Sequence, residues 1–174
     1  MANRIRRPQS GGSSLEGARP DRNAHEGGEP LLSVLVEVEV PRYGFVKRLG
    51  DGTVDYISPL PSPFNYGAVP DSNAPDGDRL DVVLLGPRRA AGTRVTAPVR
   101  GLVHFVDAGE QDPKLVVGLE PPTRGELRRV RAFFAAYAHA KGVLNRARGK
   151  GGPTRLDGLD VPADPTLVKG WLDR

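Results

Sequence analysis

The sequence contains no cysteine, and aromatic residues make up only 6% of it. The absence of cysteine excludes disulfide bonds and thiolate metal sites, and it fits a reducing cytoplasm, where we expect the protein to act. No run approaches the roughly 18 apolar residues that a membrane-spanning helix needs, so we expect no membrane association. The early arginines Arg4, Arg6 and Arg7 are followed by glycine and serine instead of an apolar run, and no signal peptide is predicted.

The formal net charge of +4 and the pI of about 9.7 first suggest a nucleic-acid-binding protein. The distribution of charge argues against this, because no basic stripe is interleaved with aromatic residues that could stack on bases. Five arginines lie within the first 30 residues, and the remaining basic residues are spread among acidic ones. We therefore expect no specific nucleic-acid partner, and a mildly basic surface that attracts small anionic substrates.

Residues 1–30 are rich in glycine, serine, proline and charge, with almost no large apolar side chains. Such a segment cannot bury enough surface to offset the entropy of ordering it, and a disordered N-terminal tail is predicted. Its four acidic residues argue against a transit peptide: Glu16, Asp21, Glu26 and Glu29. Residues 31–174 are predicted to form a single domain.

Short β-strands dominate the predicted structure of this domain. Val34, Val36, Val38 and Val40 alternate with other residues and define one face of a first strand, with Glu37 and Glu39 on the other face. A hairpin is predicted around the glycines at 50 and 52, and further strands at residues 80–85, 94–99, 102–106 and 114–119. This spacing favours a mainly β member of the α+β class: a small closed OB-like barrel of about five strands with flanking helices.

One long helix is expected to begin after Thr123, because Thr123 and Glu126 have the spacing of a capping box. Apolar residues then recur at helical spacing as far as Tyr137, and Gly142 is the predicted C-terminal cap. Residues 145–155 are predicted to form a basic loop. A short second helix is expected to open at residues 164–165, an Asp-Pro pair.

Two acidic clusters are the candidate functional features. Asp76, Asp78 and Asp81 fall within six residues, and Asp107 and Asp112 follow a later strand. Either cluster alone could be an ordinary turn or a solvated hairpin loop. Loops at strand ends of one small barrel can converge, however, and so many carboxylates would repel one another unless cations neutralised them. Oxygen ligands without cysteine select Mg²⁺ or Mn²⁺, ions that bind phosphates and activate water.

Several motifs in the correct order resemble the family I inorganic pyrophosphatases. Residues 76–82 (DGDRLDV) are similar to the family motif D-G-D-x-L-D-V, which normally has proline where this chain has Arg79. Residues 65–67 (NYG) match the family's N-Y-G segment eleven residues upstream of the first aspartate. Further matches are the D-x4-D-x-K spacing, the glutamate two residues before Pro41, the lysine six residues after it, and the F-F-x-x-Y helix. The resemblance spans residues 34–141.

The resemblance implies the pyrophosphatase fold and hydrolysis of inorganic pyrophosphate to two phosphates by metal-activated water, with Mg²⁺ as the cofactor and Mn²⁺ as an alternative. The substrate is thus a small phosphate compound, and a homo-oligomer is implied as well. Asp78 would accept the proton of the attacking water. The metal ligands that the resemblance implies are Asp76, Asp81, Asp107, Asp112 and, through metal-bound water, Glu39. The phosphate-binding residues that it implies are Lys47, Lys114, Tyr66 and Tyr137.

The chain departs from the family at four expected functional positions, occupied by Leu49, Tyr56, Ser62 and Ala138. Tyr56 and Ala138 replace an arginine and a lysine. Each lost contact to a phosphate could cost about 1.5–3 kcal/mol unless Arg48, Arg79 or Lys141 replaces it. Two alternatives therefore stay open: a phosphohydrolase of the same fold acting on another phosphoanhydride or phosphate ester, and a non-catalytic binding or regulatory protein. Retention of Asp78 argues against a non-catalytic protein, because a purely structural barrel needs no general base.

Overall fold

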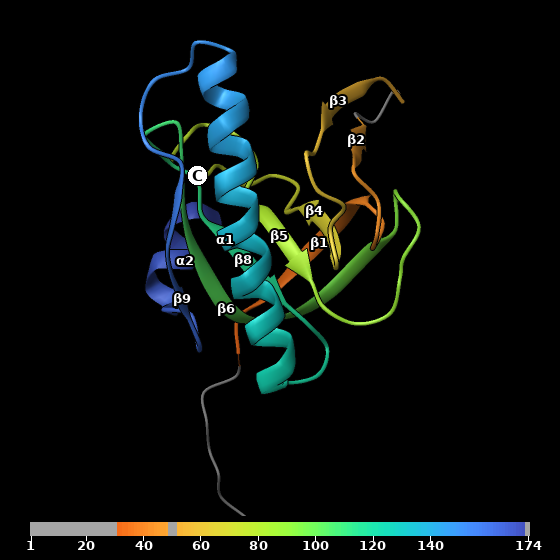
Figure 1. Ribbon diagram of the computed structural model, residues 1–174. Coiled ribbons are helices and arrows are strands. Elements are labelled where there is room, and N and C mark those ends of the chain that lie inside the picture. The colour runs from red at the N-terminus through yellow and green to blue at the C-terminus, as the bar shows by residue number, and fades with distance from the viewer. Residues whose placement is uncertain (1–30, 49–51, 173–174) are drawn as a thin grey trace, which may run out of the picture.

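The computed structural model describes residues 31–48 and 52–172, and the predicted N-terminal tail lies outside this part of the chain. Figure 1 shows the arrangement of the elements. In chain order they are β1 (Ser33–Val40), β2 (Val46–Arg48), β3 (Val54–Ile57), β4 (Asn65–Ala68), β5 (Asp81–Leu84), β6 (Arg94–Asp107), β7 (Glu110–Gln111), β8 (Lys114–Val117), α1 (Arg124–Ala147), β9 (Arg155–Asp160) and α2 (Pro165–Leu172).

Five strands form a closed ring in the order β1-β4-β5-β8-β6, which the pairing of β6 with β1 completes. Neighbouring strands are antiparallel except β5 and β8, which are parallel. The predicted mainly β fold with about five strands in a ring and flanking helices is confirmed. β9 adds to β6 outside the ring, and β2 and β3 form the predicted separate hairpin.

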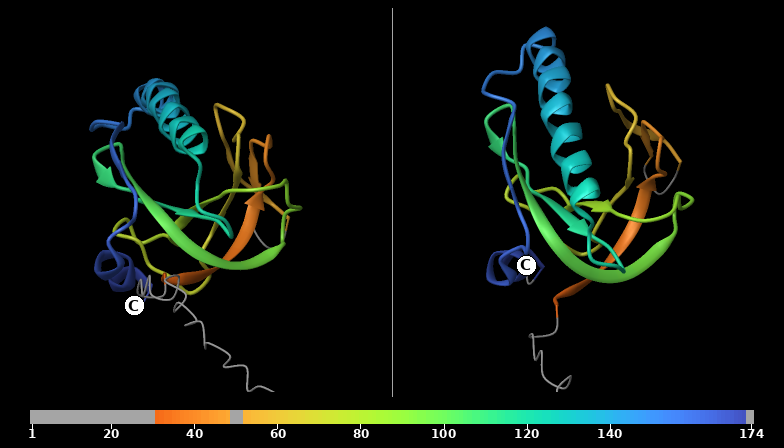
Figure 2. Two further views of the ribbon diagram at one scale, coloured as in Figure 1. Left: turned by 90° about the horizontal axis from the view of Figure 1, so that it is seen from below. Right: turned by 60° about the horizontal axis from the view of Figure 1, so that its bottom comes forward.

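The two strands predicted at residues 94–99 and 102–106 are one continuous strand, β6, which Figure 2 shows as a long curved arrow. The prediction of a break at Arg100 and Gly101 was wrong. The register against β8 shifts between Val99 and Gly101, so the strand bends at an irregularity instead of turning. A Cβ atom at Gly101 would lie 2.6 Å from the carbonyl oxygen of Asp160, and the approach of the β9 end therefore requires glycine there.

Two apolar cores lie on opposite faces of these strands. Val82 and Leu84 belong to a core inside the ring, together with the valines at 34, 36 and 38 on the predicted buried face of β1 and with Val168 of α2. Val83, between them, points the other way into a second core with Phe134 of α1. Since side chains alternate along a strand, β5, β6 and β8 each contribute to both cores, and α1 is held against the outer face of the ring.

Helix α1 begins as predicted but continues further. Thr123 is its N-cap with a complete capping box, whereas the predicted C-terminal cap, Gly142, lies inside the helix. The helix continues because Asn145 is buried and held by side-chain hydrogen bonds, which offset the cost of an internal glycine. Gly149, with φ of 71°, adopts the left-handed conformation after the helix. The predicted basic loop at residues 145–155 is therefore shorter, and the strand β9 that follows was missed.

The second helix opens at the predicted residues. Pro165 is its first residue, and the backbone N–H of Thr166 donates to the Asp164 side chain at 2.8 Å. Among the helices of the described residues, none has the length and apolar character needed to cross a bilayer.

Replacing Thr123 by alanine is expected to lower the free energy of unfolding by about 1 kcal/mol at pH 7. The Thr123 backbone and hydroxyl groups lower the pKa of Glu126 from its ordinary value of 4.5. The stability that comes from the hydrogen bonds between Glu126 and Thr123 is therefore complete above pH 4.5. It is lost as the pH falls through the lower pKa that Glu126 has in the folded state. Urea denaturation across this range should show the difference between variant and wild type narrowing at acid pH. Thr166→Ala, in an exposed part of α2, is the control and should change stability by less than about 0.5 kcal/mol.

Candidate active site

A cavity of about 720 Å³ lies between α1, the β2–β3 hairpin and one end of the ring. Nine of the ten predicted site residues line it; Glu39 contacts two of the lining side chains instead. Seven acidic residues line the cavity: Asp55, Asp76, Asp78, Asp81, Asp107, Glu110 and Asp112. Five basic residues also line it: Lys47, Arg79, Lys114, Lys141 and Lys150. The cavity thus contains four of the chain's five lysines and still more carboxylates than cations.

The parallel pairing of β5 with β8 explains how the two acidic clusters meet. Asp81 begins β5 and stands in register with Lys114, which begins β8. Asp76 and Asp78 lie in the loop just before β5, and Asp112 just before β8. Because parallel strands begin at the same edge of a sheet, these side chains share one end of the ring. Convergence of the two acidic loops was expected from the sequence, but it depended on this long-range pairing.

Lys114 is the buried centre of the site. Its ammonium donates to Asp81 Oδ2 at 2.7 Å and contacts the carboxylate of Asp112. The hydroxyl of Tyr66 donates to the same oxygen of Asp81 at 2.6 Å. Burial alone would raise the pKa of Asp81, but Lys114 and Lys47 hold it below its ordinary value. Burial raises the pKa of Asp112 although Lys114 opposes the shift. The pKa values of the two carboxylates are therefore shifted in opposite directions, although both contact the same lysine.

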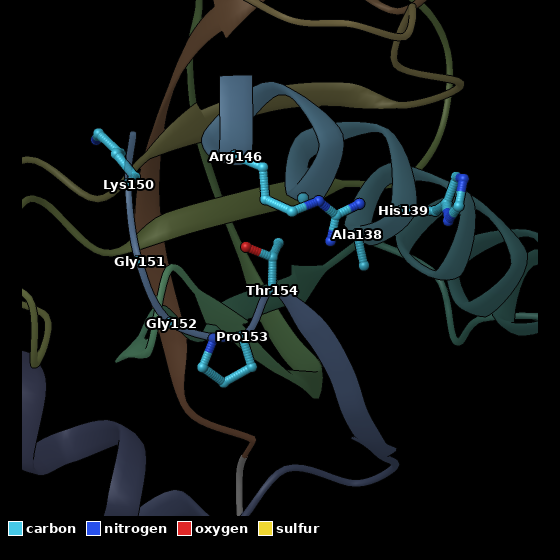
Figure 3. Close-up of a pocket in the computed structure, with 9 residues that line it drawn as sticks. Ala138, His139, Arg146, Lys150, Gly151, Gly152, Pro153 and Thr154 are labelled. Carbon is cyan, nitrogen blue, oxygen red and sulfur yellow. The ribbon is translucent and has the colours of Figure 1, made fainter. Parts of the chain in front are cut away.

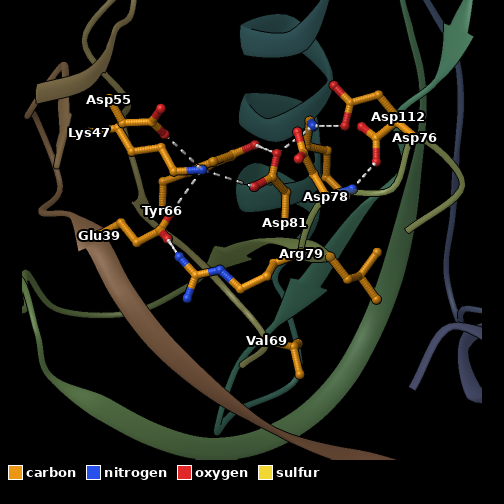
Figure 4. A network of polar contacts seen from close by, with 12 residues as sticks. Glu39, Lys47, Asp55, Tyr66, Val69, Asp76, Asp78, Arg79, Asp81 and Asp112 are labelled. Carbon is orange, nitrogen blue, oxygen red and sulfur yellow. Dashed lines mark hydrogen bonds and ion pairs between the residues drawn. The ribbon is translucent and has the colours of Figure 1, made fainter. Parts of the chain in front are cut away.

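A second set of ion pairs surrounds Glu39 (Figure 4). Lys47 Nζ lies 3.2 Å from Glu39 Oε2 and 3.9 Å from Asp81 Oδ1, and Arg79 Nη2 donates to Glu39 Oε1 at 2.6 Å. Glu39 is buried, and burial raises its pKa although both cations oppose the shift. Arg79 stands where the resembled family has proline, so this chain places an additional cation beside Glu39.

Asp107, at the end of β6, is held by three side chains from elsewhere in the chain. Lys141 Nζ lies 2.7 Å from its Oδ2, while Asn145 donates to Oδ1 at 2.7 Å and Thr154 at 3.4 Å. From the sequence, Lys141 was named only as a replacement cation, and Asn145 and Thr154 were missed. No motif marks those two residues, and both fall within residues 145–155, which were predicted to form a basic loop.

Asp76 and Asp78 differ from the other carboxylates because both are exposed. The backbone N–H of Asp78 donates to Asp76 Oδ1 at 3.1 Å, which orients Asp76 within the loop. In the part of the chain that the structure describes, neither carboxylate has an ion-pair partner. Both are therefore accessible to a ligand in the cavity.

Within residues 31–48 and 52–172, no three acidic or histidine side chains converge closely enough to form a ready-made metal site. The chemistry of the donors nevertheless fits a hard divalent cation: the cavity presents carboxylate oxygens in excess of its own cations, and the chain has no cysteine. Asp76, Asp81 and Asp112 are the residues that could hold such an ion, because they line the same part of the cavity wall at the starts of β5 and β8.

The positions that depart from the family differ in their surroundings. Tyr56 lines the cavity, and its hydroxyl lies 3.4 Å from that of Tyr137. Ser62 also lines it, but its hydroxyl donates to the carbonyl oxygen of Phe64. Of the replacement cations, Arg79 and Lys141 line the cavity, whereas Arg48 donates to the carbonyl oxygen of Gly52. Leu49 lies outside the described residues.

Ala138, where the family has a lysine, lines a different cavity of about 350 Å³ on the other side of α1 (Figure 3). The rest of that wall is formed by His139, Gly142, Arg146 and residues 150–154. The helix therefore turns position 138 away from the carboxylates, and the cation that α1 contributes to the acidic cavity is Lys141.

Comparison with known proteins agrees with this geometry. The sequence model of the family described as inorganic pyrophosphatase matches residues 38–124, which contain the end of β1 and all of β2 to β8 with their acidic loops. The chain belongs to the inorganic pyrophosphatase family. Proteins of this family are named as hydrolases that act on pyrophosphate, and the resemblance stated from the motifs is confirmed.

Individual pyrophosphatases are related to the chain at low identity. The inorganic pyrophosphatase of a Nostoc species is 26% identical over 157 residues, covering 82% of this chain and 83% of the relative. That of a Synechocystis species is 30% identical over 92 residues, covering 49% of this chain and 54% of the relative. The crystal structure of an inorganic pyrophosphatase from Neisseria gonorrhoeae matches with a TM-score of 0.64 and 24% identity, covering 82% of this chain and 90% of that one. This structural likeness supports the fold assignment.

Proposed function

We propose that the chain hydrolyses inorganic pyrophosphate to two phosphates in the cytoplasm, with Mg²⁺ as its cofactor. The observation that supports this most strongly is the single cavity in which Asp76, Asp78, Asp81 and Asp112 face Lys47 and Lys114. A phosphoanhydride needs cationic groups around its oxygens and a group that removes a proton from water. Both kinds of group are present in this cavity.

The lysines and tyrosines would bind the substrate. Lys114 is buried, and although burial alone would lower its pKa, the neighbouring carboxylates raise it, so the ammonium stays charged across the physiological range. The pKa of Tyr66 and that of Tyr137 are also raised, chiefly by burial, which keeps both hydroxyls as hydrogen-bond donors to phosphate oxygens. Lys47, from β2, adds a second ammonium 3.9 Å from Asp81 Oδ1.

Asp78 would accept the proton of the attacking water. It is one of the two exposed carboxylates that line the cavity from the loop before β5, and its backbone N–H is held by a hydrogen bond to the other, Asp76. Bound Mg²⁺ would lower the pKa of the attacking water and neutralise the charge that develops on the leaving phosphate. Asp76, Asp81 and Asp112 would hold the ion. Glu39, between Lys47 and Arg79, would orient these cations at the edge of the cavity.

Removal of divalent metal is expected to abolish pyrophosphate hydrolysis. The purified full chain should release phosphate from pyrophosphate in millimolar Mg²⁺, lose this activity in EDTA, and regain it when Mg²⁺ or Mn²⁺ is restored. Phosphate release is measured colorimetrically, with circular dichroism recorded in parallel to show that the protein stays folded in EDTA. Turnover that is unchanged in EDTA would contradict the proposal.

A second substrate class follows from the aromatic wall of the cavity. Phe45, Tyr56 and Phe133 line it, and Tyr56 stands where the family has an arginine. Aromatic rings suit the organic part of a nucleoside diphosphate or another organic phosphoanhydride. The same assay with these compounds separates the two functions: release from an organic diphosphate without release from pyrophosphate would favour the second.

The proposed active unit is residues 31–174, acting as a homo-oligomer. Light scattering coupled to size-exclusion chromatography measures the molar mass directly. A mass equal to the 18.7 kDa chain would contradict the proposed assembly.

A further inference from the structure

We propose that Lys141 supplies, at Asp107, the positive charge that the family resemblance assigned to a divalent cation, and that its ammonium binds a phosphate group of the substrate. Asp107 would then be the anchor of this lysine and would bind no metal ion. The proposal rests on the proposed function, because it concerns the same cavity and substrate class.

The first support is that both oxygens of Asp107 are already engaged. Oδ2 faces the ammonium of Lys141 at 2.7 Å, and Oδ1 accepts hydrogen bonds from Asn145 and Thr154. Asn145 is itself buried and also donates to Thr154 at 3.0 Å, so the two partners of Oδ1 are hydrogen-bonded to each other. A metal ion at Asp107 would have to displace a charged partner from Oδ2 or break these hydrogen bonds at Oδ1.

The second support is that the ammonium of Lys141 is held in place over two aromatic rings. Its Nζ lies 5.1 Å from the ring centre of Tyr56 and 5.8 Å from that of Tyr137. The side chain is only 18% exposed and lines the cavity. An ammonium has three N–H donors, and a cation fixed by rings and a carboxylate can offer another donor to phosphate without first being ordered.

The helical period explains why Lys141 can replace the lysine that is missing at position 138. Residues four apart lie on the same face of a helix, so Lys141 lies above Tyr137 on the wall of the acidic cavity. Position 138 is rotated by about 100° and lines the other cavity. The chain thus has its helix cation one turn further along, and there it reaches Asp107.

The other carboxylates leave room for metal where Asp107 does not. Asp76 and Asp78 have no ion-pair partner in the described part of the chain. Asp112 pairs there only with Lys114, which it shares with Asp81, and the second ammonium near Asp81, that of Lys47, is 3.9 Å away. We therefore expect divalent ions at Asp76, Asp81 and Asp112, next to a permanent side-chain cation at Asp107.

Counting bound Mn²⁺ by equilibrium dialysis of the full chain, without substrate, tests the metal part. Asp107→Asn should leave the number of ions per chain unchanged. Lys141→Met should raise it by one, and Asp107→Asn added to Lys141→Met should remove that additional ion. A fall in the number of ions on Asp107→Asn alone, or no increase in Lys141→Met, would overturn the assignment.

Titration of the metal-free chain with inorganic phosphate by calorimetry tests the substrate part. Lys141→Met is expected to raise the Kd about tenfold, the loss of one charged contact. Lys141→Arg keeps the charge and should stay within about threefold of wild type. Lys169→Met is the matched control, since Lys169 is exposed on α2 and is the one lysine that does not line the cavity. Equal Kd values for Lys141→Met and Lys169→Met would overturn the proposal.

These measurements are independent of turnover. If the wild type releases no phosphate from pyrophosphate but the ion counts and phosphate affinities change as described, the proposed function fails and the role of Lys141 stands. If pyrophosphate is hydrolysed and the Lys141 variants bind metal and phosphate like the wild type, the proposed function stands and the role of Lys141 fails.

Discussion

Asp78→Asn is expected to reduce kcat for pyrophosphate about 10²–10⁴-fold, the usual contribution of a positioned general base. Asparagine keeps the shape of the side chain but cannot accept the proton of the attacking water. Because Asp78 is exposed and both of its described hydrogen bonds use only its backbone, stability should change by less than about 0.5 kcal/mol. Steady-state phosphate release in saturating Mg²⁺ measures the effect, and urea denaturation measures the stability.

Asp71→Asn is the matched control for this variant. Asp71 is an exposed aspartate in the same loop, seven residues earlier, and it does not line the cavity. Its φ of 53° is a conformation that asparagine tolerates as well as aspartate does. If Asp78→Asn retained more than a tenth of the wild-type kcat, the assignment of the base would be wrong, whatever the effect on KM.

Lys114→Met is expected to lower the free energy of unfolding by about 3–5 kcal/mol, the cost of removing one partner from a buried ion pair. Lys114 is almost fully buried, and its ammonium contacts both Asp81 and Asp112. Without it, the half-buried carboxylates of Asp81 and Asp112 remain with no cation between them. Urea denaturation in EDTA at pH 7 measures this loss.

Added Mg²⁺ should stabilise Lys114→Met more than it stabilises the wild type, because the ion would then be the main neutralising charge for Asp81 and Asp112. Lys169→Met, the exposed lysine on α2, is the control and should remain within about 0.5 kcal/mol of wild type. An unfolding free energy for Lys114→Met equal to that of this control would show that the two aspartates do not depend on Lys114.

Much of the fold could be predicted because local signals matched it. The alternation of Val34, Val36, Val38 and Val40 follows the pleat of a strand with one buried face, and all four are buried. The capping box at Thr123 is complete within four residues and needs no tertiary contact. The errors lie where distant segments decide the outcome: Gly142 did not end α1, since a buried asparagine downstream is held by Asp107 at the end of β6.

The sequence alone determined the family, through short motifs whose order and spacing do not depend on how the chain folds. It also named most of the acidic and basic residues that line the cavity, but not Asp55, Glu110 or Lys150. Only the tertiary structure decided how those charges pair. Lys114 lies between Asp81 and Asp112 because β5 and β8 run parallel in register, and Lys141 reaches Asp107 because α1 packs across the outer face of the ring. The sequence shows which residues are charged, but only long-range packing brings opposite charges together. Here that pairing distinguishes Asp107, which Lys141 already neutralises, from the carboxylates that we expect to bind metal.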